Sequence, residues 1–566
     1  MVLPSALLSL LALSPVVIAG YGGNLNYCSP SLNDNHVNLG INTDIIHRRS
    51  LTRLAPSTEA SDSNLTVSGN VPLYNHENEQ YANASAHPIC VEYRMFSDKG
   101  ADEVVDKARA FTSSDIEYTV KFEATGLKAF TPYWYRFNLC GSDNASPLAR
   151  TKTLPSAEQN MDEIKLAVPS CSNYPEGYFN AYGNVAPKDS VEYAVHLGDY
   201  IYEYESGVPG VDERAVLPQR EIFSLYDYRT RLGQYRTDQD LVASHQKFPW
   251  ITVWDGHEIA DNGYRNDFTG LRNTEDSFLT YGPQISVNQR KLNAVRAYFE
   301  WMPIRKMGMG DGLRVWRNFQ IGNLLNLIMI NKRNYNRSIT DIGDNTEYIK
   351  HIHDDAGRSS MGARQENWFY HQLSASNTRG AKWRVIGNQI VFAHLQELRD
   401  DGSLSFDTDS WTAYQANQNR TLKHMYDNGI VNNINIAGDS HVNWVSDMIR
   451  KGTKPCNKIT GERSVGIEFA STAVSSIGMS KKSRQDAEQV ANAYSINPEL
   501  KWVEGYYRGY FELHLRQDEA EARCFGCPTV STRNSWELPL ANWTVKHSES
   551  YLERLFAGVA VEAGVL

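Results

Sequence analysis

Beyond residue 160 the chain alternates short apolar runs with segments whose apolar residues recur at helical spacing, and this alternation restricts the fold more than any other feature. Apolar runs with the length of buried strands occur at residues 165–169, 193–197, 250–254, 323–330, 383–387 and 433–438. Between them, residues 292–302 and 364–373 carry the helical period. Strands that are apolar throughout are buried on both faces, so the pattern predicts an α/β core with helices covering the sheets.

Residues with metal-binding side chains follow several of these runs. They are Cys171 after the first run, Asp199 and Tyr202 after the second, Asp255, His257 and Asn262 after the third, and Asp439 and His441 after the last. Because ligand sites in α/β sheets gather at the carboxyl ends of strands, these residues are predicted to converge on one crevice. The alternative interpretation is a set of turns at a sheet edge with solvated side chains.

The donor types divide into two sets. The first set is Cys171, Asp199, Tyr202 and His441, and the second is Asp199, Asn262 and Asp439. A thiolate, a phenolate and an imidazole with a bridging carboxylate suit a transition-metal ion, whereas the oxygens of the second set suit a harder cation. Two ions about 3.5–4 Å apart clamp the oxygens of an in-line phosphoryl transfer and generate hydroxide at moderate pH. The constellation therefore predicts chemistry on a phosphate ester.

The first residues have the character of a secretory leader. Residues 2–19 are rich in Leu, Val and Ala, carry no charge and end at the small residues Ala19 and Gly20, which predicts a signal peptide over residues 1–19. A retained membrane anchor is the alternative, and Pro4 and Pro15 disfavour it. N-glycosylation acceptor sequences begin at Asn64, Asn83, Asn144, Asn336, Asn419 and Asn542. These features predict a secreted glycoprotein, extracellular or in the cell wall, without a membrane span in the mature chain.

The other segments of the chain differ in their patterns of polar and apolar residues. Residues 20–87 are polar and predict a loop-rich lead-in, whereas 88–155 contain short alternating runs such as ICVEYRMF and PYWYRFNLC. Alternating runs without a helical period predict a small antiparallel β-sandwich of the immunoglobulin or fibronectin type. The core is predicted over 160–545, and within it residues 506–515 are predicted to form an outer edge strand. Residues 546–566 are predicted to be a C-terminal tail.

The chain has seven cysteines, and their odd number is informative. Secreted proteins usually pair their thiols, so one cysteine is left over. Three bridges are open to Cys28, Cys90, Cys140, Cys456, Cys524 and Cys527. Among these we expect a disulfide between Cys90 and Cys140, because both lie in the same predicted small domain, and the other pairings stay open. Cys171 is then the free thiol.

The overall charge is moderately acidic. The chain has 56 Lys and Arg against 66 Asp and Glu, a formal net charge of -10 at pH 7 and a pI of ≈ 5.9. This balance disfavours a nucleic-acid scaffold and a polybasic membrane surface as partners. A phosphate ester substrate is therefore expected to be attracted by local cations, and the composition leaves the oligomeric state open.

The order of the local motifs resembles one known family. The segments VPSCSNYPEGYFNAY, HLGDYIYE, YRTRLGQYRTDQDL, WDGHEIADN, AYFEWMPIR, VIGNQIVF and GDSHVNWV together are similar to the alkaline phosphatase D family of metallophosphoesterases, over essentially the whole mature chain. The resemblance implies an αββα metallophosphatase sandwich and secreted phosphomonoesterase or phosphodiesterase activity, in which metal-bound hydroxide attacks the ester. It also implies Fe³⁺ with Ca²⁺ beside it, the identity of the second metal being open.

The resemblance assigns roles to individual residues. It implies that the iron is held by Cys171, Asp199, Tyr202 and His441, with Asp199 bridging to calcium and Asp439 on the calcium side. Asp255 and His257 are the implied catalytic residues, His257 as an acid or leaving-group partner, and the alternative for His257 is simple packing at a helix start. Candidates for substrate contact are Asn173, Arg333 and Asn388, for each of which a structural role is the alternative.

Two positions depart from the family pattern. Gly256 stands where the family commonly has Asp, and Asn331, Lys332 and Arg333 stand where it usually has Asp-Thr-Arg. Both changes remove a carboxylate, which weakens the binding of a hard divalent cation. Lys332 either faces the phosphate or lies in solvent. The leading hypothesis is an active metallophosphoesterase with an open preference between monoesters and diesters, and the alternative is a catalytically impaired phosphate-binding or cell-surface glycoprotein.

Overall fold

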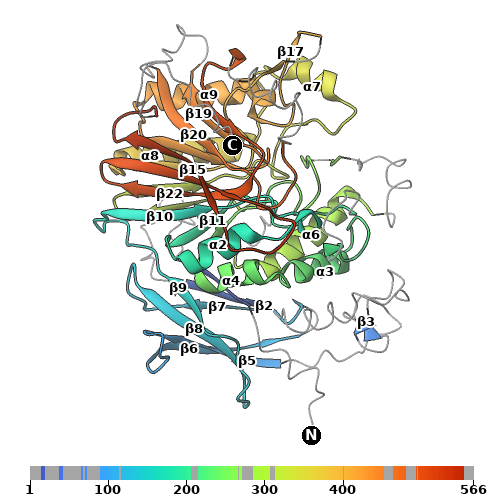
Figure 1. The fold of residues 1–566 in the computed structure, drawn as a ribbon, viewed down its shortest axis with the longest axis vertical. Helices are drawn as coiled ribbons and strands as arrows, with labels where there is room; N and C mark the ends of the chain where they lie inside the picture. Colours follow the sequence, from blue (N-terminus) through green and yellow to red (C-terminus); the bar gives the residue numbers. More distant parts are fainter. Residues whose placement is uncertain are drawn as a thin grey trace.

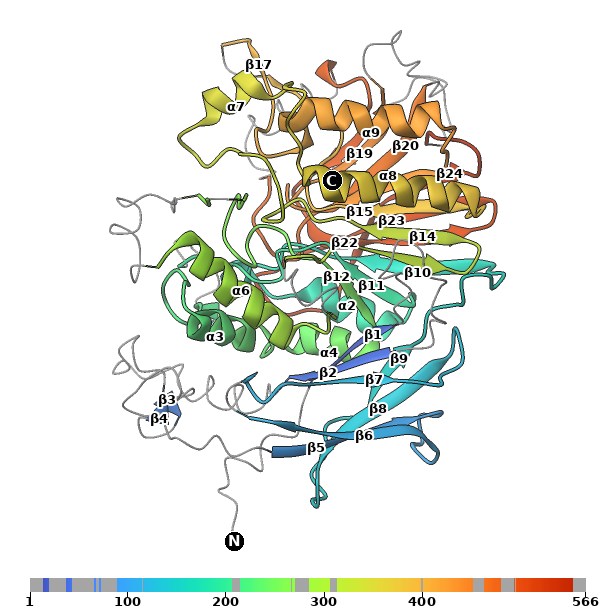
Figure 2. The same cartoon turned by 180° about the vertical axis from the view of Figure 1, so that it is seen from behind.

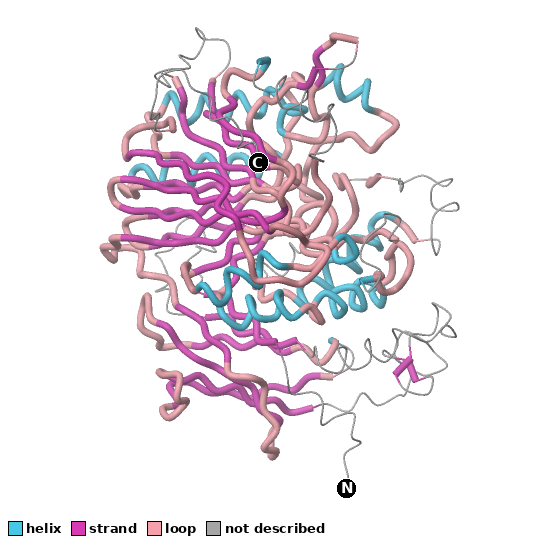
Figure 3. Tube along the Cα trace, viewed as in Figure 1, coloured by secondary structure: helices cyan, strands magenta, loops and turns pink. Residues whose placement is uncertain are grey.

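The computed structural model describes residues 89–552 apart from 114–115, 206–213, 266, 270–284, 306–312, 399–400, 451–462, 480–492 and 494. Before residue 89 it describes the strands β1 (Ser14–Ala19), β2 (Val37–Asn42), β3 (Thr66–Val67) and β4 (Val71–Pro72). An N-terminal group of strands lies at one end of the molecule and a larger core at the other (Figure 1). In the core the helices form two groups with strands between them (Figure 3).

The N-terminal domain consists of two antiparallel sheets. One has the order β6-β5-β8-β9 and the other β1-β2-β7, with β5 (Ile89–Phe96), β6 (Val104–Thr112), β7 (Val120–Ala124), β8 (Pro132–Leu139) and β9 (Ala149–Lys152). Alternate residues of the strands point inward, and the rings of Tyr93, Phe122 and Phe137 pack together in the core between the sheets. The predicted disulfide between Cys90 and Cys140 is confirmed.

Strand β1 occupies residues that the sequence analysis assigns to the signal peptide. It pairs with β2, with Ser14 opposite Asn42 and Ala19 opposite Val37. A strand of the folded domain and a cleaved leader are alternatives for the same residues, so the signal peptide stays a prediction. The lead-in predicted over 20–87 contains β2, whose other edge pairs with β7.

The first sheet of the core has six strands in the order β12-β11-β10-β22-β23-β24. Their bounds are β10 (Glu163–Val168), β11 (Tyr193–His196), β12 (Trp250–Thr252), β22 (Arg508–Arg516), β23 (Glu519–Cys527) and β24 (Leu538–Lys546). Strands β10, β11 and β12 are parallel, whereas β22 to β24 are antiparallel to their neighbours. The parallel strands therefore end at the same edge of the sheet, where Cys171, Asp199 and Asp255 follow them.

The second sheet has seven strands in the order β13-β14-β15-β18-β20-β19-β21. Their bounds are β13 (Arg317–Ile321), β14 (Leu325–Met329), β15 (Trp383–Gly387), β18 (Asn433–Ala437), β19 (Asn443–Ile449), β20 (Ser464–Ala470) and β21 (Leu500–Glu504). Strands β14, β15, β18 and β20 are parallel. Asp439 and His441 follow the carboxyl end of β18, in the middle of this sheet.

Side-chain alternation explains why the strands of the second sheet are apolar throughout. In β14, Leu327 and Met329 belong to the large core shared with the six-stranded sheet. Ile328, which points to the opposite face, packs in a second core with Phe369 of α8 (Gly362–Thr378). Both faces of the sheet are therefore dry, as the sequence pattern predicts.

The helices lie on the outer faces of the two sheets (Figure 2). Helix α8 contacts β14 and α9 (Gln415–Asp427) contacts β20, whereas α2 (Asn180–Lys188) contacts β22 and β23. The helices beside α2 are α3 (Leu225–Tyr235), α4 (Gln239–Lys247) and α6 (Val287–Trp301). The remaining elements are α7 (Thr346–Ile352), the 3₁₀ turns η4 (Tyr174–Glu176) and η6 (Trp411–Tyr414), and the pair β16 (Glu397–Leu398) and β17 (Leu404–Ser405). The predicted mixed α/β class is confirmed.

Two sequence-based expectations are wrong. The run 506–515 contains β22, which lies between β10 and β23 and not at an outer edge, because β23 and β24 extend the sheet beyond it. Three disulfides are not formed, because Cys524 and Cys527 are free and buried. Their separation of three positions along β23 directs their side chains to opposite faces. Cys28 and Cys456 lie outside the described residues.

Among the described residues, no helix combines the length and the apolar character needed to cross a bilayer.

Candidate metal centre

Loops from both sheets of the core meet at one place because two glycines allow close contact. Gly198 follows β11 with a φ of 109°, and a Cβ there would overlap the backbone nitrogen of Asp255. Gly438 follows β18, and a Cβ there would lie 2.7 Å from Oγ of Ser170. Since any other side chain would push these loops apart, glycine at both positions lets the ends of β10, β11, β12 and β18 converge.

Four of the predicted donors form what we call the thiol-side group: Cys171, Asp199, Tyr202 and His441. Sγ of Cys171, a carboxylate oxygen of Asp199 and a ring nitrogen of His441 lie within 4.8 Å of one another. Oη of Tyr202 donates to Oδ2 of Asp199 at 3.3 Å and lies 3.0 Å from Nε2 of His441. Ligands of one ion are separated by at most twice a metal–ligand distance of about 2.0–2.6 Å, so this spacing fits a single ion.

The imidazole of His441 is oriented for this role. Its Nδ1 lies 2.8 Å from the carbonyl oxygen of Ile477, to which it can donate. A proton on Nδ1 leaves the lone pair of Nε2 directed toward Tyr202 and the rest of the thiol-side group. A hydrogen bond to the distal nitrogen is the usual way in which a metal-binding histidine is held.

Three carboxylates form what we call the carboxylate-side group: Asp199, Asp255 and Asp439. Their oxygens also lie within 4.8 Å of one another, so Asp199 belongs to both groups, as predicted for a bridging ligand. The guanidinium of Arg333 lies among these carboxylates: Nε donates to Asp255, Nη2 donates to Asp439 at 2.6 Å, and Nη1 donates to Asp409. Within the described part of the chain, Oδ2 of Asp255 has no hydrogen-bond partner, which leaves a buried oxygen available to a cation.

The backbone at these positions is unusual. Left-handed φ angles are found at Cys171 (59°), Asp199 (53°), Asn262 (50°), Asp439 (66°) and His441 (58°). A residue other than glycine in this region costs about 1–3 kcal/mol and persists where the surrounding structure enforces it, typically at functional sites. The shared strain at five predicted ligands is independent support for a site at this place.

The ionisation of the donors reflects burial among like charges. Burial raises the pKa of Asp255 well above its ordinary value, opposed by Arg333, and raises the pKa of Asp439 to about 7 against the same opposition. Burial and the charge of Asp199 also raise the pKa of the Cys171 thiol and the Tyr202 phenol. A polyvalent cation reverses these preferences, because it stabilises thiolate, phenolate and carboxylate. The donor set therefore fits a metal ion.

His257 lies against the thiol-side group. Its ring stacks on that of Tyr202 with the centroids 4.1 Å apart, and its backbone N–H donates to Oδ1 of Asp199 at 3.1 Å. Nδ1 lies 2.7 Å from a carboxylate oxygen of Glu203, while Nε2 lies 3.8 Å from Oδ1 of Asp261. Burial lowers the pKa of His257, but the charges of Glu203 and Asp199 outweigh it and raise that pKa well above its ordinary value. The ring is thus a proton donor beside the donors of the centre.

Two further side chains connect the loops of the centre. The carboxylate of Glu258 accepts from the backbone N–H of Tyr200 at 2.7 Å and from that of Asp255 at 2.8 Å. Ser476 donates to the carbonyl oxygen of Cys171, and its Oγ lies 2.8 Å from Oη of Tyr202. These bonds hold the loops after β10, β11 and β12 in register with one another.

The other predicted site residues are placed less directly. Asn262 is half-buried in the loop after β12, with its backbone nitrogen 3.6 Å from where a Cβ of Gly256 would stand. Asn173 begins η4, and its carbonyl accepts from Oγ of Ser475 at 2.7 Å. Asn388 is fully buried and donates to the carbonyl of Ile390. This contact of Asn173 involves its backbone only, and Oδ1 of Asn388 is buried without a hydrogen-bond partner among the described residues, so substrate contact stays a prediction for both.

Side chains at positions that depart from the family pattern form contacts within the protein. Asn331 donates to the carbonyl of Leu313 at 3.2 Å and accepts from the backbone N–H of Arg333 at 3.0 Å. Lys332 is fully buried with its ammonium over the ring of Trp411, which excludes the alternative that it lies in solvent. Asp409, which the sequence analysis does not identify, holds Arg333 and accepts from Arg337 at 2.7 Å. It follows none of the apolar runs that the sequence marks as buried strands, so no sequence signal identified it.

Comparison with known proteins gives consistent results. Residues 166–524 match the family model described as PhoD-like phosphatase, and residues 45–155 match the model of the PhoD-like phosphatase N-terminal domain. The curated protein "Alkaline phosphatase D" of Bacillus subtilis (strain 168) is 30% identical over 484 residues, which cover 84% of this chain and 78% of that protein. The solved structure "Structure of PhoD" aligns with a TM-score of 0.74 and 24% identity, over 97% of this chain and 92% of that one.

Proposed function

We propose that this chain, which belongs to the PhoD-like phosphatase family and is a phosphoric ester hydrolase, acts through a metal centre formed by its thiol-side and carboxylate-side groups. The observation that carries the proposal is the convergence of four different donor types from loops of both sheets. Ferric iron suits the thiol, phenol and imidazole, and calcium suits the carboxylates. We further propose that the two helix-covered sheets are the αββα metallophosphatase sandwich.

Each residue then has a defined task. Bound metal ions polarise the phosphoryl group and make water nucleophilic at moderate pH. Cys171, Tyr202 and His441 hold the first ion, and Asp199 belongs to both groups. Nδ1 of His257 is engaged by Glu203, so Nε2 is the nitrogen from which the ring delivers a proton to the leaving alcohol. Asp255 and Asp439 hold the second ion, in competition with Arg333.

A single oxygen atom offers the most direct test. Tyr202→Phe removes the phenol and keeps the ring that stacks on His257. The purified wild-type protein is expected to contain iron by plasma mass spectrometry and to show a visible phenolate charge-transfer band. The variant is expected to lose the band and at least about tenfold in kcat/KM on 4-nitrophenyl phosphate.

Tyr426→Phe is the matched control, because Tyr426 is 55% exposed and lies outside the centre. It should keep the metal, the band and the activity. An iron content, spectrum and rate that are the same in Tyr202→Phe and in wild type would count against the proposed centre. Parallel assays with bis(4-nitrophenyl) phosphate measure the preference between monoesters and diesters.

We also propose that the protein is exported as a glycoprotein, with cleavage after Ala19 and an immunoglobulin-like N-terminal domain. The leader composition and the acceptor sequences support this. Mass spectrometry of protein recovered from the culture medium tests it, and a mature chain that retains residues 14–19 would show that β1 belongs to the folded domain. The alternative of a non-catalytic phosphate-binding glycoprotein is not favoured, because the family match is to phosphatases over most of the chain.

A further inference from the structure

One face of α3 presents three polar side chains to the loops of the centre. They are Tyr228, Arg231 and Tyr235, in the run YRTRLGQY that begins at Tyr228. Their spacing of three and then four residues places them on one face of a helix. None of the three belongs to the thiol-side or the carboxylate-side group, so their role has to follow from what they contact.

The phenol oxygen of Tyr235 joins two loops of the centre. Oη accepts from the backbone N–H of Tyr174 at 3.0 Å and from that of Tyr202 at 3.2 Å. Tyr174 lies three residues beyond Cys171, and Tyr202 is itself a member of the thiol-side group. The ring of Tyr235 is fully buried, with its centroid 5.4 Å from that of Tyr174 and 5.6 Å from that of Phe179. A single oxygen atom therefore connects the segment after β10 with the segment after β11.

The guanidinium of Arg231 holds the other side of the same peptide segment. Nη1 donates to the carbonyl of Tyr202 and, at 3.1 Å, to that of Tyr204. Nε and Nη2 donate to three carbonyls of residues 217–220. Arg231 and Tyr235 lie about one helical turn apart, and together they bind the C=O and the N–H of Tyr202. Both backbone polar groups of a predicted metal ligand are thus bound by side chains of α3.

Tyr228 extends this contact to the third loop. Its Oη donates to the carbonyl of Ile259 and accepts from Nε of Arg290 at 3.0 Å. Ile259 lies two residues beyond His257 in the loop after β12. From Tyr228 to Tyr235, the face of α3 thus contacts the segments after β12, β11 and β10 in turn, which is the order of these strands in the sheet.

The helix that carries this face is itself well anchored. It begins with a capping box, in which the side chain of Ser224 accepts from the backbone N–H of Asp227 and the side chain of Asp227 accepts from that of Ser224. Arg229, on another face, donates from two nitrogens to the carboxylate of Glu300 in α6, at 2.8 Å each. Every residue from Asp227 to Tyr235 is buried. Side chains on such an element fix distances more precisely than side chains on loops.

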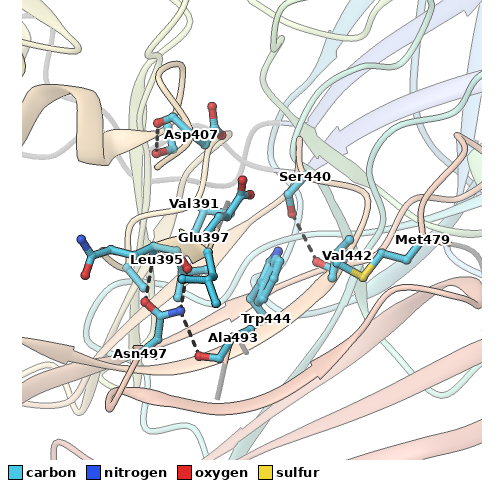
Figure 4. Close-up of a pocket in the computed structure, with 14 residues that line it drawn as sticks. Val391, Leu395, Glu397, Asp407, Ser440, Val442, Trp444, Met479, Ala493 and Asn497 are labelled. Atoms are coloured by element: carbon cyan, nitrogen blue, oxygen red, sulfur yellow. Dashed lines mark hydrogen bonds between the residues drawn. The ribbon is translucent and has the colours of Figure 1, made fainter. Parts of the chain in front are cut away.

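The loop after β18 is held by different contacts. Oγ of Ser440, the residue before His441, donates to the carbonyl of Val442 at 3.3 Å (Figure 4). Nδ1 of His441 lies 2.8 Å from the carbonyl oxygen of Ile477, and the carbonyl of His441 accepts from Oγ1 of Thr472 at 3.2 Å. These contacts lie within the loop and with the segment after β20. The face of α3, in contrast, contacts segments that follow strands of the first sheet.

We propose that this face of α3 orients the donors that come from the first sheet, and that Arg231 and Tyr235 are positioning residues for Tyr202 and for the segment that carries Cys171. The inference rests on the proposed function, because it assigns α3 to the ligands of the proposed centre. Without the oxygen of Tyr235, two buried N–H groups lose their acceptor and the two segments are no longer joined at this point. The phenol of Tyr202 and the thiol of Cys171 then meet a metal ion in a different geometry.

Removing one oxygen atom tests the inference. Tyr235→Phe keeps the buried ring, and the bonds from the backbone N–H groups of Cys171 and Ser172 to the carbonyls of Gly198 and Asp199 remain, so the variant should fold. On the full-length protein, Fe³⁺ is titrated in competition with nitrilotriacetate while the visible spectrum is recorded. The apparent affinity for Fe³⁺ is expected to fall about tenfold or more, since loss of a group that orients metal ligands typically costs about 10–100-fold. The phenolate band is expected to shift.

Tyr133→Phe is the matched control. Oη of Tyr133 likewise accepts from a backbone N–H, that of Lys128 at 2.9 Å, and the side chain is 5% exposed, but it lies in the N-terminal domain. Removing this oxygen is expected to lower Tm and to leave the affinity for Fe³⁺ and the band unchanged. Arg231→Lys is a second variant, which keeps the charge but has one nitrogen in place of the three that bind carbonyls, and its band and affinity are expected to change as in Tyr235→Phe.

The outcomes separate the inference from the proposed function. Changes in Tyr235→Phe and Arg231→Lys that are absent from Tyr133→Phe support the inference. An affinity and a band in Tyr235→Phe equal to those of the wild type, with Tm lowered as in the control, overturn the inference and leave the proposed function standing. If Tyr235→Phe does not fold, Arg231→Lys decides by the same two measurements. A wild-type protein that binds no Fe³⁺ overturns both, because α3 then has no centre to orient.

Discussion

The two donor groups of the candidate centre balance their charges in different ways. On the carboxylate side, Asp255 and Asp439 each form an ion pair with the buried guanidinium of Arg333. On the thiol side, the described residues provide no such pair for Cys171 or Tyr202, whose polar atoms contact the carboxylate of Asp199 and the side chains of His441 and Ser476. The carboxylate side is therefore ion-paired with a guanidinium of the chain, whereas the thiol side has the ring of His257 packed against Tyr202 but no ion pair to Cys171 or Tyr202 among the described residues.

This difference predicts a hierarchy between the two ions. Burying carboxylates without a counter-charge is unfavourable, and a guanidinium or a metal ion can each relieve that penalty. An ion on the thiol side meets the Asp199 carboxylate and donors that are not ion-paired within the described residues, whereas an ion on the carboxylate side has to displace or share Arg333. We expect the first ion to be held tightly and the second to exchange readily.

Removing the shared ligand should have the largest effect. Asp199→Asn keeps the shape of the side chain but removes the negative charge that belongs to both groups. Metal ions contribute several kcal/mol to such reactions, so kcat/KM is expected to fall at least about 10³-fold. Plasma mass spectrometry should show the loss of both ions, and a steady-state assay measures the rate.

Asp354→Asn is the control, because Asp354 is exposed and remote from the donors. If Asp199→Asn lost only the second ion and kept most of its turnover, Asp199 would belong to the carboxylate side alone, and the two groups would be separate sites.

Replacing Arg333, the buried cation of the carboxylate side, probes this side directly. Arg333→Gln leaves Asp255 and Asp439 buried without their partner, and breaking such a pair typically costs about 3–5 kcal/mol of stability. A divalent cation that takes the place of the guanidinium should restore much of this loss. Thermal unfolding with and without added Ca²⁺ is the measurement, and the calcium-dependent rise in Tm should be larger in the variant than in the wild type.

Arg337→Gln distinguishes the general loss of stability that follows removal of a buried arginine from a rescue by Ca²⁺ at the carboxylate side. Arg337 binds the same Asp409 that Arg333 binds, but it forms no ion pair with Asp255 or Asp439 among the described contacts. The Arg337→Gln variant is expected to be less stable than the wild type, but its calcium-dependent rise in Tm is not expected to be larger. A response of equal size in both variants would mean that Arg333 has no special relation to the second ion.

The sequence predicts the thiol-side group better than the arrangement of the carboxylate-side group. Each thiol-side donor follows an apolar strand or lies a few residues beyond it, and the rule that ligands gather at carboxyl ends of strands brings them together. The disulfide of the N-terminal domain and the α/β class were accessible for similar reasons, since both follow from local pattern and proximity along the chain.

The position of Arg333 among the carboxylates could not be predicted in this way. Arg333 meets Asp255 and Asp409 over separations of 78 and 76 residues, and Asp409 stands in a loop without periodicity. Contacts of this kind depend on how the two sheets pack, which local patterns do not encode. The same holds for β22, whose central position is decided by the strands that follow it.

The smallest expected effect comes from restoring one carboxylate. Gly256 has no φ in the left-handed region, and a Cβ there would be in ordinary contact, 3.6 Å from the nitrogen of Asn262. Gly256→Asp should therefore fold, and an added carboxylate beside Asp255 shifts the competition with Arg333 toward the metal ion. The apparent Kd for Ca²⁺ is expected to fall about tenfold, because the affinity of such sites follows the number of charged ligands.

Isothermal calorimetry on protein already loaded with the first ion measures this change, and Gly256→Asn provides the same shape without the charge. An improvement in Gly256→Asp but not in Gly256→Asn would show that the carboxylate side is limited by its charge. Equal Kd values in all three proteins would show that Arg333 excludes the second ion whatever the number of carboxylates, so that this half of the centre uses the guanidinium as its permanent cation.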